Sequence, residues 1–146
     1  MKQVTSFYLG ECLFGIESAY VNSVLSPGKS IRIPQKEEQL FNRTMTLADG
    51  RFIHVINAEK LFGLDHGPVH ESSKVIVLQS ERPLMGLMVD AIANLGEFDS
   101  SELGEILPLS KINKKFLSGT LTGADGEVVL LLNAKALIDA LTRSPL

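Results

Sequence analysis

The chain has 146 residues, 45% of them hydrophobic, with a formal net charge of −3, one cysteine and no tryptophan. This length is typical of one domain, and the acidic balance argues against a nucleic-acid-binding protein, which needs a basic surface. A lone Cys12 excludes a disulfide framework and favours a reducing compartment. No apolar run approaches the roughly 20 residues of a membrane span, and the first residues lack a signal-peptide pattern. We therefore expect a cytoplasmic globular protein.

The first half of the chain predicts short strands, because β-branched and aromatic residues recur in runs that end at Gly or Pro. The first two runs meet at Gly10-Glu11 and indicate a hairpin, and the third suits either a strand or one helical turn. The expected strands cover residues 4–8, 12–17, 20–25, 31–33, 45–47 and 52–56.

The last two of these runs flank Asp49-Gly50. Asp-Gly between two strands predicts a two-residue type I′ turn, which needs positive φ at both central residues. Asn57 then follows as the expected N-cap of a short helix over residues 58–62, and Gly63 should end that helix. Residues 66–72 contain Gly, Pro, His and Ser and are expected to form a linker.

The second half predicts the same order of elements: strands, an Asp-Gly turn and a capped helix. Asp125-Gly126 is the expected turn, and Asn133 should cap a C-terminal helix that runs to about residue 142. Residues 97–105 read as an acidic loop. The expected strands cover residues 75–78, 84–89, 116–121 and 128–132.

An internal repeat relates the two halves. Six positions around the first Asp-Gly recur 76 residues later, so that 48–50, 57–58 and 61 match 124–126, 133–134 and 137. A second repeated pattern relates Leu13-Phe14-Gly15-Ile16 to Leu84-Met85-Gly86-Leu87 with an offset of 71. We therefore predict a mainly β fold of two pseudo-symmetric, five-stranded barrels, because closure removes exposed strand edges. The first barrel is expected in residues 1–66 and the second, with the C-terminal helix, in 73–146.

No constellation for bond chemistry is apparent, so we expect neither an enzyme nor a metal or cofactor site. The two histidines of residues 66–72 have no acidic or cysteine companion at ligand spacing, and His54 lies within an expected strand. Cys12 lacks a neighbour that would activate a thiol. Phosphate-binding loops, nucleophile elbows and paired-cysteine zinc motifs are missing. The acidic residues of 97–105 indicate a solvated loop or a patch for a basic partner.

Several segments, taken in order, resemble the CheW family of chemotaxis coupling proteins. Residues 7–17 (FYLGECLFGIE) are similar to that family's opening strand, Leu-Gly, and aromatic-Gly-Ile-acid pattern. Residues 75–78 (VIVL) and 85–92 (MGLMVDAI) resemble its hydrophobic-Gly-hydrophobic-hydrophobic-Val-Asp signature, and 116–119 and 128–137 its closing strands and helix. The resemblance spans nearly the whole chain.

The resemblance implies one domain made of two small SH3-like barrels and a non-enzymatic adaptor role. Family members bridge the tip of chemoreceptors to the regulatory domain of the CheA histidine kinase, and other CheW-like proteins are further possible partners. No nucleic acid and no direct membrane insertion are expected. By this resemblance, a receptor groove would include Val21, Val24, Asp90 and Ala91, and a kinase-side surface would include Met45, Leu47 and Gly50.

Two departures from the family pattern bear on partner choice. Asp49 stands where the family has Arg before the turn glycine, and Ser23 stands where it has Glu two residues after the Val. Losing both together leaves no lone buried charge. We therefore expect kinase binding to be kept and receptor binding to be weakened. The alternatives are an accessory or inhibitory CheW-like protein that does not bind receptors, and a small ligand-sensing module with a metabolite between the barrels.

Overall fold

The computed structural model describes residues 2–26, 31–32, 43–46, 50–64, 73–79, 84–99, 102–105, 115–123 and 126–143. The predicted linker at 66–72 and Leu47 lie outside these residues. The elements in chain order are β1 (Lys2–Leu9), β2 (Cys12–Glu17), the 3-10 helix η1 (Ser18–Tyr20), β3 (Val21–Leu25), β4 (Ile31–Arg32), β5 (Arg43–Thr46), β6 (Phe52–Asn57), α1 (Ala58–Leu61), β7 (Lys74–Leu78), β8 (Met85–Val89), β9 (Ala91–Phe98), β10 (Leu117–Thr122), β11 (Val128–Leu132) and α2 (Ala134–Arg143).

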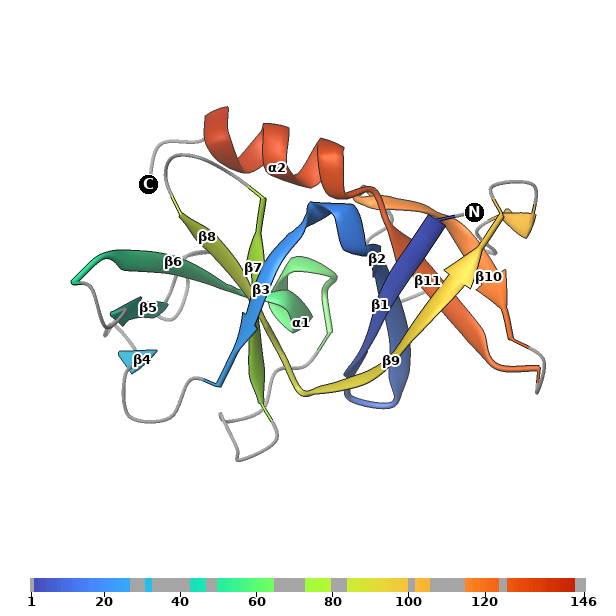
Figure 1. The fold of residues 1–146 in the computed structure, drawn as a ribbon, viewed down its shortest axis with the longest axis horizontal. Helices are drawn as coiled ribbons and strands as arrows, with labels where there is room; N and C mark the ends of the chain where they lie inside the picture. The colour runs from blue at the N-terminus through green and yellow to red at the C-terminus, as the bar shows by residue number, and fades with distance from the viewer. Residues whose placement is uncertain are drawn as a thin grey trace.

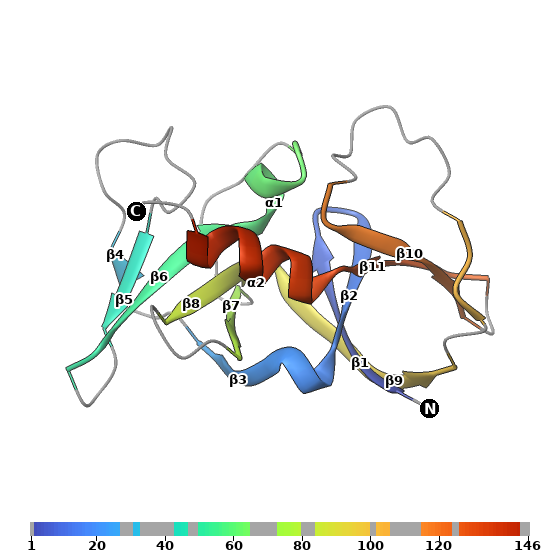
Figure 2. The ribbon, with the colours of Figure 1, turned by 90° about the horizontal axis from the view of Figure 1, so that it is seen from above.

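The strands form two sheets that curl on either side of a central junction (Figure 1; Figure 2). The first sheet, here called barrel A, has the order β10-β11-β2-β1-β9, and the second, barrel B, has the order β3-β7-β8-β6-β5-β4. In barrel A, a bridge between Gly104 and Thr120 adds a further contact to the edge strand β10. Barrel B has six strands rather than the expected five, and its short edge strand β4, beside β5, lies within the predicted strand 31–33.

The strands are not divided between the barrels as the sequence suggested. The hairpin β1–β2 lies in barrel A with β9, β10 and β11, whereas β7–β8 lies in barrel B with β3 to β6. The reason is two crossings of the chain from one sheet to the other. The turn η1 leads from β2 to β3, and a single residue, Asp90, leads from β8 to β9. Each barrel therefore combines strands from both sides of the predicted linker.

The predicted internal repeat is confirmed by the strand register. Phe7 pairs with Ile92 between β1 and β9, and Leu78 pairs with Val21 between β7 and β3, which is the same pairing shifted by 71 positions. The parallel pairings agree as well, because β11 pairs with β2 and β6 pairs with β8. The two barrels are thus related by a pseudo-two-fold axis. The first hairpin of each copy of the repeat, β1–β2 or β7–β8, is part of the barrel that the other copy completes.

The main hydrophobic core lies at the junction between the barrels. Successive side chains of β1 point to opposite faces of the sheet. Phe7 and Leu9 therefore pack in the junction, whereas Val4 packs inside barrel A. The Phe14 ring stacks on Phe62, which follows α1, with centroids 4.8 Å apart. Leu137 of α2 is also part of this cluster. A second cluster fills barrel B, consisting of Ile53, Val55, Val75, Val77 and Met88.

The helix ends follow the sequence prediction. The side chain of Asn133 accepts a hydrogen bond from the backbone N–H of Ala136 at 3.1 Å, which is the expected N-cap geometry. Asn57 precedes α1 and is buried, and Gly63 has a φ of 75° just after that helix. The third predicted segment, 20–25, is a strand from Val21 onward, and only Tyr20 belongs to the preceding 3-10 helix.

The Asp-Gly turns differ from the prediction. Gly50 and Gly126 both have positive φ, as expected, but the strand pairing ends at Thr46–Phe52 and at Thr122–Val128. In the second turn, the N–H of Gly123 donates to Glu127 at 2.7 Å and the N–H of Gly126 donates to Gly123 at 3.0 Å. This loop holds three residues between Gly123 and Glu127, so it is no two-residue type I′ turn, and its last residue is the left-handed glycine.

One strand of barrel A was missed. The sequence prediction placed an acidic loop from residue 97, whereas β9 runs from Ala91 to Phe98 and pairs with β1. Phe98 is buried in the small cluster inside barrel A. The strand contains Asn, Gly and Glu, which have low β-propensity, and its pairing along β1 outweighs that preference.

Candidate interaction surfaces

The four residues predicted for a receptor groove lie on the edge strands of the two barrels. Val21 and Val24 belong to β3, the edge strand of barrel B, whereas Asp90 and Ala91 lie where β9, the edge strand of barrel A, begins. Both strands contribute to the junction, because Val21 and its repeat counterpart Ile92 pack against the central core. We call the exposed parts of β3 and of the β8–β9 connection the junction surface.

Within this surface, the two valines are not equivalent. Val21 is partly buried against the central core, so its side chain is committed to packing. Val24 is 40% exposed and is one of two large hydrophobic side chains that stand out in solvent among the described residues. Ser23 lies between them in sequence and is half-buried. Val24 is therefore the apolar side chain of β3 that a partner could contact.

Asp90 has a structural role in addition to its place on the junction surface. Its carboxylate accepts a hydrogen bond from the backbone N–H of Gly10 at 2.5 Å, and its own N–H donates to the carbonyl of Tyr8 at 3.0 Å. Gly10 has a φ of 62°, a conformation that favours glycine. Asp90 thus ties the β1–β2 turn of barrel A to the crossing from barrel B.

The predicted kinase-side residues lie in a different part of barrel B. Met45 is in β5, paired with Ile31 on one side and with Ile53 on the other, and Gly50 is exposed at the following turn. Leu47 falls between them, outside the described residues. In the strand order, β7, β8 and β6 separate β5 from β3. The two predicted surfaces are therefore formed by different strands of barrel B.

Barrel A carries a groove that the sequence analysis did not predict. Its volume is about 700 Å³, and the exposed Val128 lies in its wall together with Cys12 and Leu130. Three glutamates, from the β1–β2 turn, the segment after β9 and the start of β11, add carboxylates to the same wall. These residues come from three stretches that are distant in the sequence, 8–13, 105 and 120–130, and the topology brings them together. They are Tyr8, Glu11, Cys12, Leu13, Glu105, Thr120, Thr122, Glu127, Val128 and Leu130.

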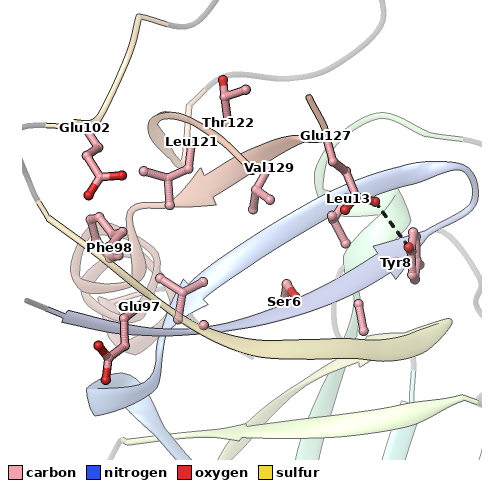
Figure 3. Close-up of a pocket in the computed structure, with 14 residues that line it drawn as sticks. Ser6, Tyr8, Leu13, Glu97, Phe98, Glu102, Leu121, Thr122, Glu127 and Val129 are labelled. Atoms are coloured by element: carbon pink, nitrogen blue, oxygen red, sulfur yellow. Dashed lines mark hydrogen bonds between the residues drawn. The ribbon is translucent and has the colours of Figure 1, made fainter. Parts of the chain in front are cut away.

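Next to this groove, the interior of barrel A contains a cavity of about 220 Å³ (Figure 3). Tyr8, Leu13, Thr122 and Glu127 line both the cavity and the groove. The Tyr8 hydroxyl donates a hydrogen bond to Glu127 at 3.5 Å, and Figure 3 shows this contact across one side of the cavity. The two hollows are thus neighbours that share part of their walls.

Neither a metal site nor a membrane helix is found in the described part of the chain. No group of three or more His, Cys, Asp and Glu side chains there has an arrangement that could hold a metal ion. The helices described are too short and too polar to cross a bilayer. Cys12 is a free thiol, partly buried against the central core.

The sequence matches the family model for the CheW-like domain over residues 3–142. The chain belongs to the CheW-like domain family. The crystal structure of the scaffolding protein TtCheW from Thermoanaerobacter tengcongensis superimposes with a TM-score of 0.76 at 24% sequence identity. That match covers 90% of this chain and 83% of TtCheW. No curated protein matches the sequence. The family membership and the shared fold confirm the predicted SH3-like architecture.

Within the CheW-like fold, the two departures from the family pattern fall in different places. Ser23 is on β3, where it is half-buried and its position alternates with that of the exposed Val24. Asp49 precedes the Gly50 turn and lies outside the described residues. The position at which the resemblance implies a Glu is thus an uncharged, half-buried side chain of β3.

Proposed function

We propose that this CheW-like protein is a non-enzymatic cytoplasmic adaptor that couples chemoreceptors to a CheA-type histidine kinase. The observation that carries the proposal is the family match over residues 3–142, which spans both copies of the repeat and therefore both barrels. The fold shared with a scaffolding protein supports it. A scaffold needs separate surfaces for separate partners, and β3 and β5 of barrel B are separated by three strands in the sheet order.

The junction surface is the proposed receptor contact. Val24 exposes apolar area on β3, and burial of such a side chain at an interface is favourable. The β5–β6 hairpin, with Met45, Leu47 and Gly50, is the proposed contact for the kinase regulatory domain. Because charged groups mainly set the specificity and orientation of an interface, the missing Glu at Ser23 and the missing Arg at Asp49 are expected to affect receptors first. Kinase binding is kept in this proposal, and receptor binding is weakened.

The first experiment compares two exposed valines. The purified full chain is tested for binding to a CheA-type regulatory domain and to a receptor-tip fragment, before and after Val24→Lys. Val128→Lys is the matched control, since Val128 is even more exposed, at 51%, but lies on barrel A. We expect Val24→Lys to weaken receptor binding at least tenfold and to leave kinase binding unchanged, whereas Val128→Lys should change neither.

The second experiment restores the family's charges. The double variant Ser23→Glu/Asp49→Arg is expected to strengthen receptor binding relative to the original chain and to leave kinase binding as it was. If the original chain binds receptor tips as tightly as an ordinary coupling protein does, the altered-partner proposal is wrong. If it binds the kinase domain but no receptor, even with the charges restored, the accessory or inhibitory role is the correct one. Absence of kinase binding would overturn the adaptor proposal itself.

A further inference from the structure

The cavity inside barrel A has the size of a small-molecule site. Its volume of about 220 Å³ exceeds that of an engineered apolar cavity of about 150 Å³ that binds benzene in another protein. The cavity opens to solvent, because exposed residues such as Gly96, Thr122 and Gly123 form part of its lining. Most of its wall is apolar and comes from β1, β2, β9, β10 and β11: Val4, Leu13, Ala93, Phe98, Leu121 and Val129.

The pseudo-two-fold explains why this cavity exists. In barrel B, the equivalent space is filled by a cluster that includes Val77 and Met88. Shifted by the repeat offset of 71, Val77 corresponds to Ser6 and Met88 corresponds to Glu17. Ser6 is only 8% exposed and lines the cavity, and Glu17 instead pairs with Lys2 at 3.5 Å. Barrel A thus lacks the apolar volume that these two side chains contribute in barrel B.

The same comparison shows that two positions of the wall keep a β-branched residue in both barrels. Val4 in barrel A corresponds to Val75 in barrel B, and Val129 corresponds to Ile53 through the offset of 76. Both members of each pair line the interior of their barrel. The two interiors therefore share these two positions, whereas other wall residues differ: Ala93 and Gly96 correspond to Asn22 and Leu25 at the offset of 71.

The negative charge around the cavity favours a cationic ligand over an anionic one. Three carboxylates, those of Glu97, Glu102 and Glu127, line it, and all three residues are exposed (Figure 3). None of the described residues in its wall is basic. A negative potential at an opening with apolar walls favours cations and disfavours anions. The cavity provides the space for a ligand, and the carboxylates favour a ligand with a positive charge.

We propose that the interior of barrel A binds a small primary amine with a compact apolar group. The hydrocarbon part fills the space next to Ser6, in contact with Val4, Phe98 and Leu121. The protonated nitrogen stays at the carboxylates, where it keeps part of its hydration and gains charge-assisted hydrogen bonds. Such a ligand site goes beyond the adaptor role, because it lies inside one barrel and uses neither the junction surface nor the β5–β6 hairpin.

Three probes of one size test this proposal on the full, unaltered chain. Benzylamine, benzyl alcohol and benzoate share a ring and differ in charge, and each is titrated while the backbone amide resonances are followed by NMR. We expect benzylamine to shift the amides of cavity residues such as Ser6, Phe98 and Leu121. Benzyl alcohol should bind at least tenfold more weakly, and benzoate should not shift them. Equal binding of benzoate and benzylamine would show that the charge argument is wrong, and no binding of any probe would show that there is no site.

Two kinds of variant then locate the bound molecule. Ser6→Val introduces the residue that barrel B has at Val77, so it should narrow the cavity without unfolding the chain and weaken benzylamine at least tenfold. Glu97→Gln and Glu127→Gln should each weaken benzylamine and leave benzyl alcohol unchanged. Glu11→Gln is the matched control, because this glutamate lines the outer groove and not the cavity, and it should change neither. Unaltered benzylamine binding in a folded Ser6→Val chain would overturn the proposal.

Discussion

A single methyl group at Gly86 should measurably destabilise the protein. Gly86 lies in β8, between β7 and β6, and a Cβ atom there would come within 2.5 Å of Val75 Cγ1 and 3.3 Å of Ile53 Cγ2. Val75 and Ile53 are fully buried, and β-branched side chains have little rotamer freedom with which to move away. Overpacking of this kind costs about 1–3 kcal/mol. For a chain of this size, that corresponds to a fall in Tm of about 3–10 °C.

Thermal and urea unfolding of Gly86→Ala measure this cost. Gly96→Ala is the matched control, because a Cβ atom on this glycine of β9 meets nothing within 4 Å and its φ is not in the left-handed region. We expect the control to be neutral or slightly stabilised, since alanine reduces the entropy of the unfolded chain. In the double variant Gly86→Ala/Val75→Ala, the two losses should not add, because removing the valine methyls makes room for the new one. If Gly86→Ala is as stable as Gly96→Ala, the proposed packing inside barrel B is wrong.

The repeat provides a second, graded version of the same test. Gly15 is the counterpart of Gly86 in barrel A, where a Cβ atom would come within 2.8 Å of Val4 Cγ1 and 3.0 Å of Val129 Cγ1. Both valines line the cavity of barrel A, so they have space into which to move. Gly15→Ala should therefore destabilise the chain less than Gly86→Ala. Equal or larger destabilisation would contradict the difference in packing between the two barrels.

Three further changes have defined outcomes. Gly126→Val places a β-branched side chain at a φ of 84° and should cost at least about 1–2 kcal/mol in urea unfolding. Asn133→Ala removes the side chain that accepts from Ala136 and should lower stability by about 1 kcal/mol, with a partial loss of helical circular dichroism from α2. Asp90→Ala removes the acceptor for the Gly10 N–H and should cost about 1 kcal/mol, with faster hydrogen exchange at that amide.

The helix ends and most strands could be predicted from the sequence, because caps, turn residues and apolar runs act within a few residues. Asn133 and Gly63 mark helix ends through chemistry within a few residues, and the structure has both features. The repeat was visible for a similar reason, since a shared pattern of turns and apolar residues persists at a fixed offset. The predicted fold class, a mainly β pair of SH3-like barrels, is confirmed by the family match and the shared fold.

The exchange of hairpins between the barrels had no comparable signal. The hydrophobic alternation of β1 is satisfied equally by any partner strand, so its pairing with β9 cannot be read from residues 2–9. The groove and the cavity were missed for the same reason. Their carboxylates, at Glu11, Glu97 and Glu127, are far apart in the sequence and share a region only because β1, β9 and β11 belong to one barrel.

The crossed connections have a consequence for how the chain must fold. β1 and β2 leave the ribosome before the two strands that flank their hairpin, β9 and β11, have been made. Until then, the hairpin has two unpaired edges, and the long-range pairing that completes barrel A is slow to form. A fragment that stops before residue 73 contains no complete sheet, and neither does the fragment that begins there. Mixed together, the two fragments could form both barrels at once, whereas each alone would remain unfolded.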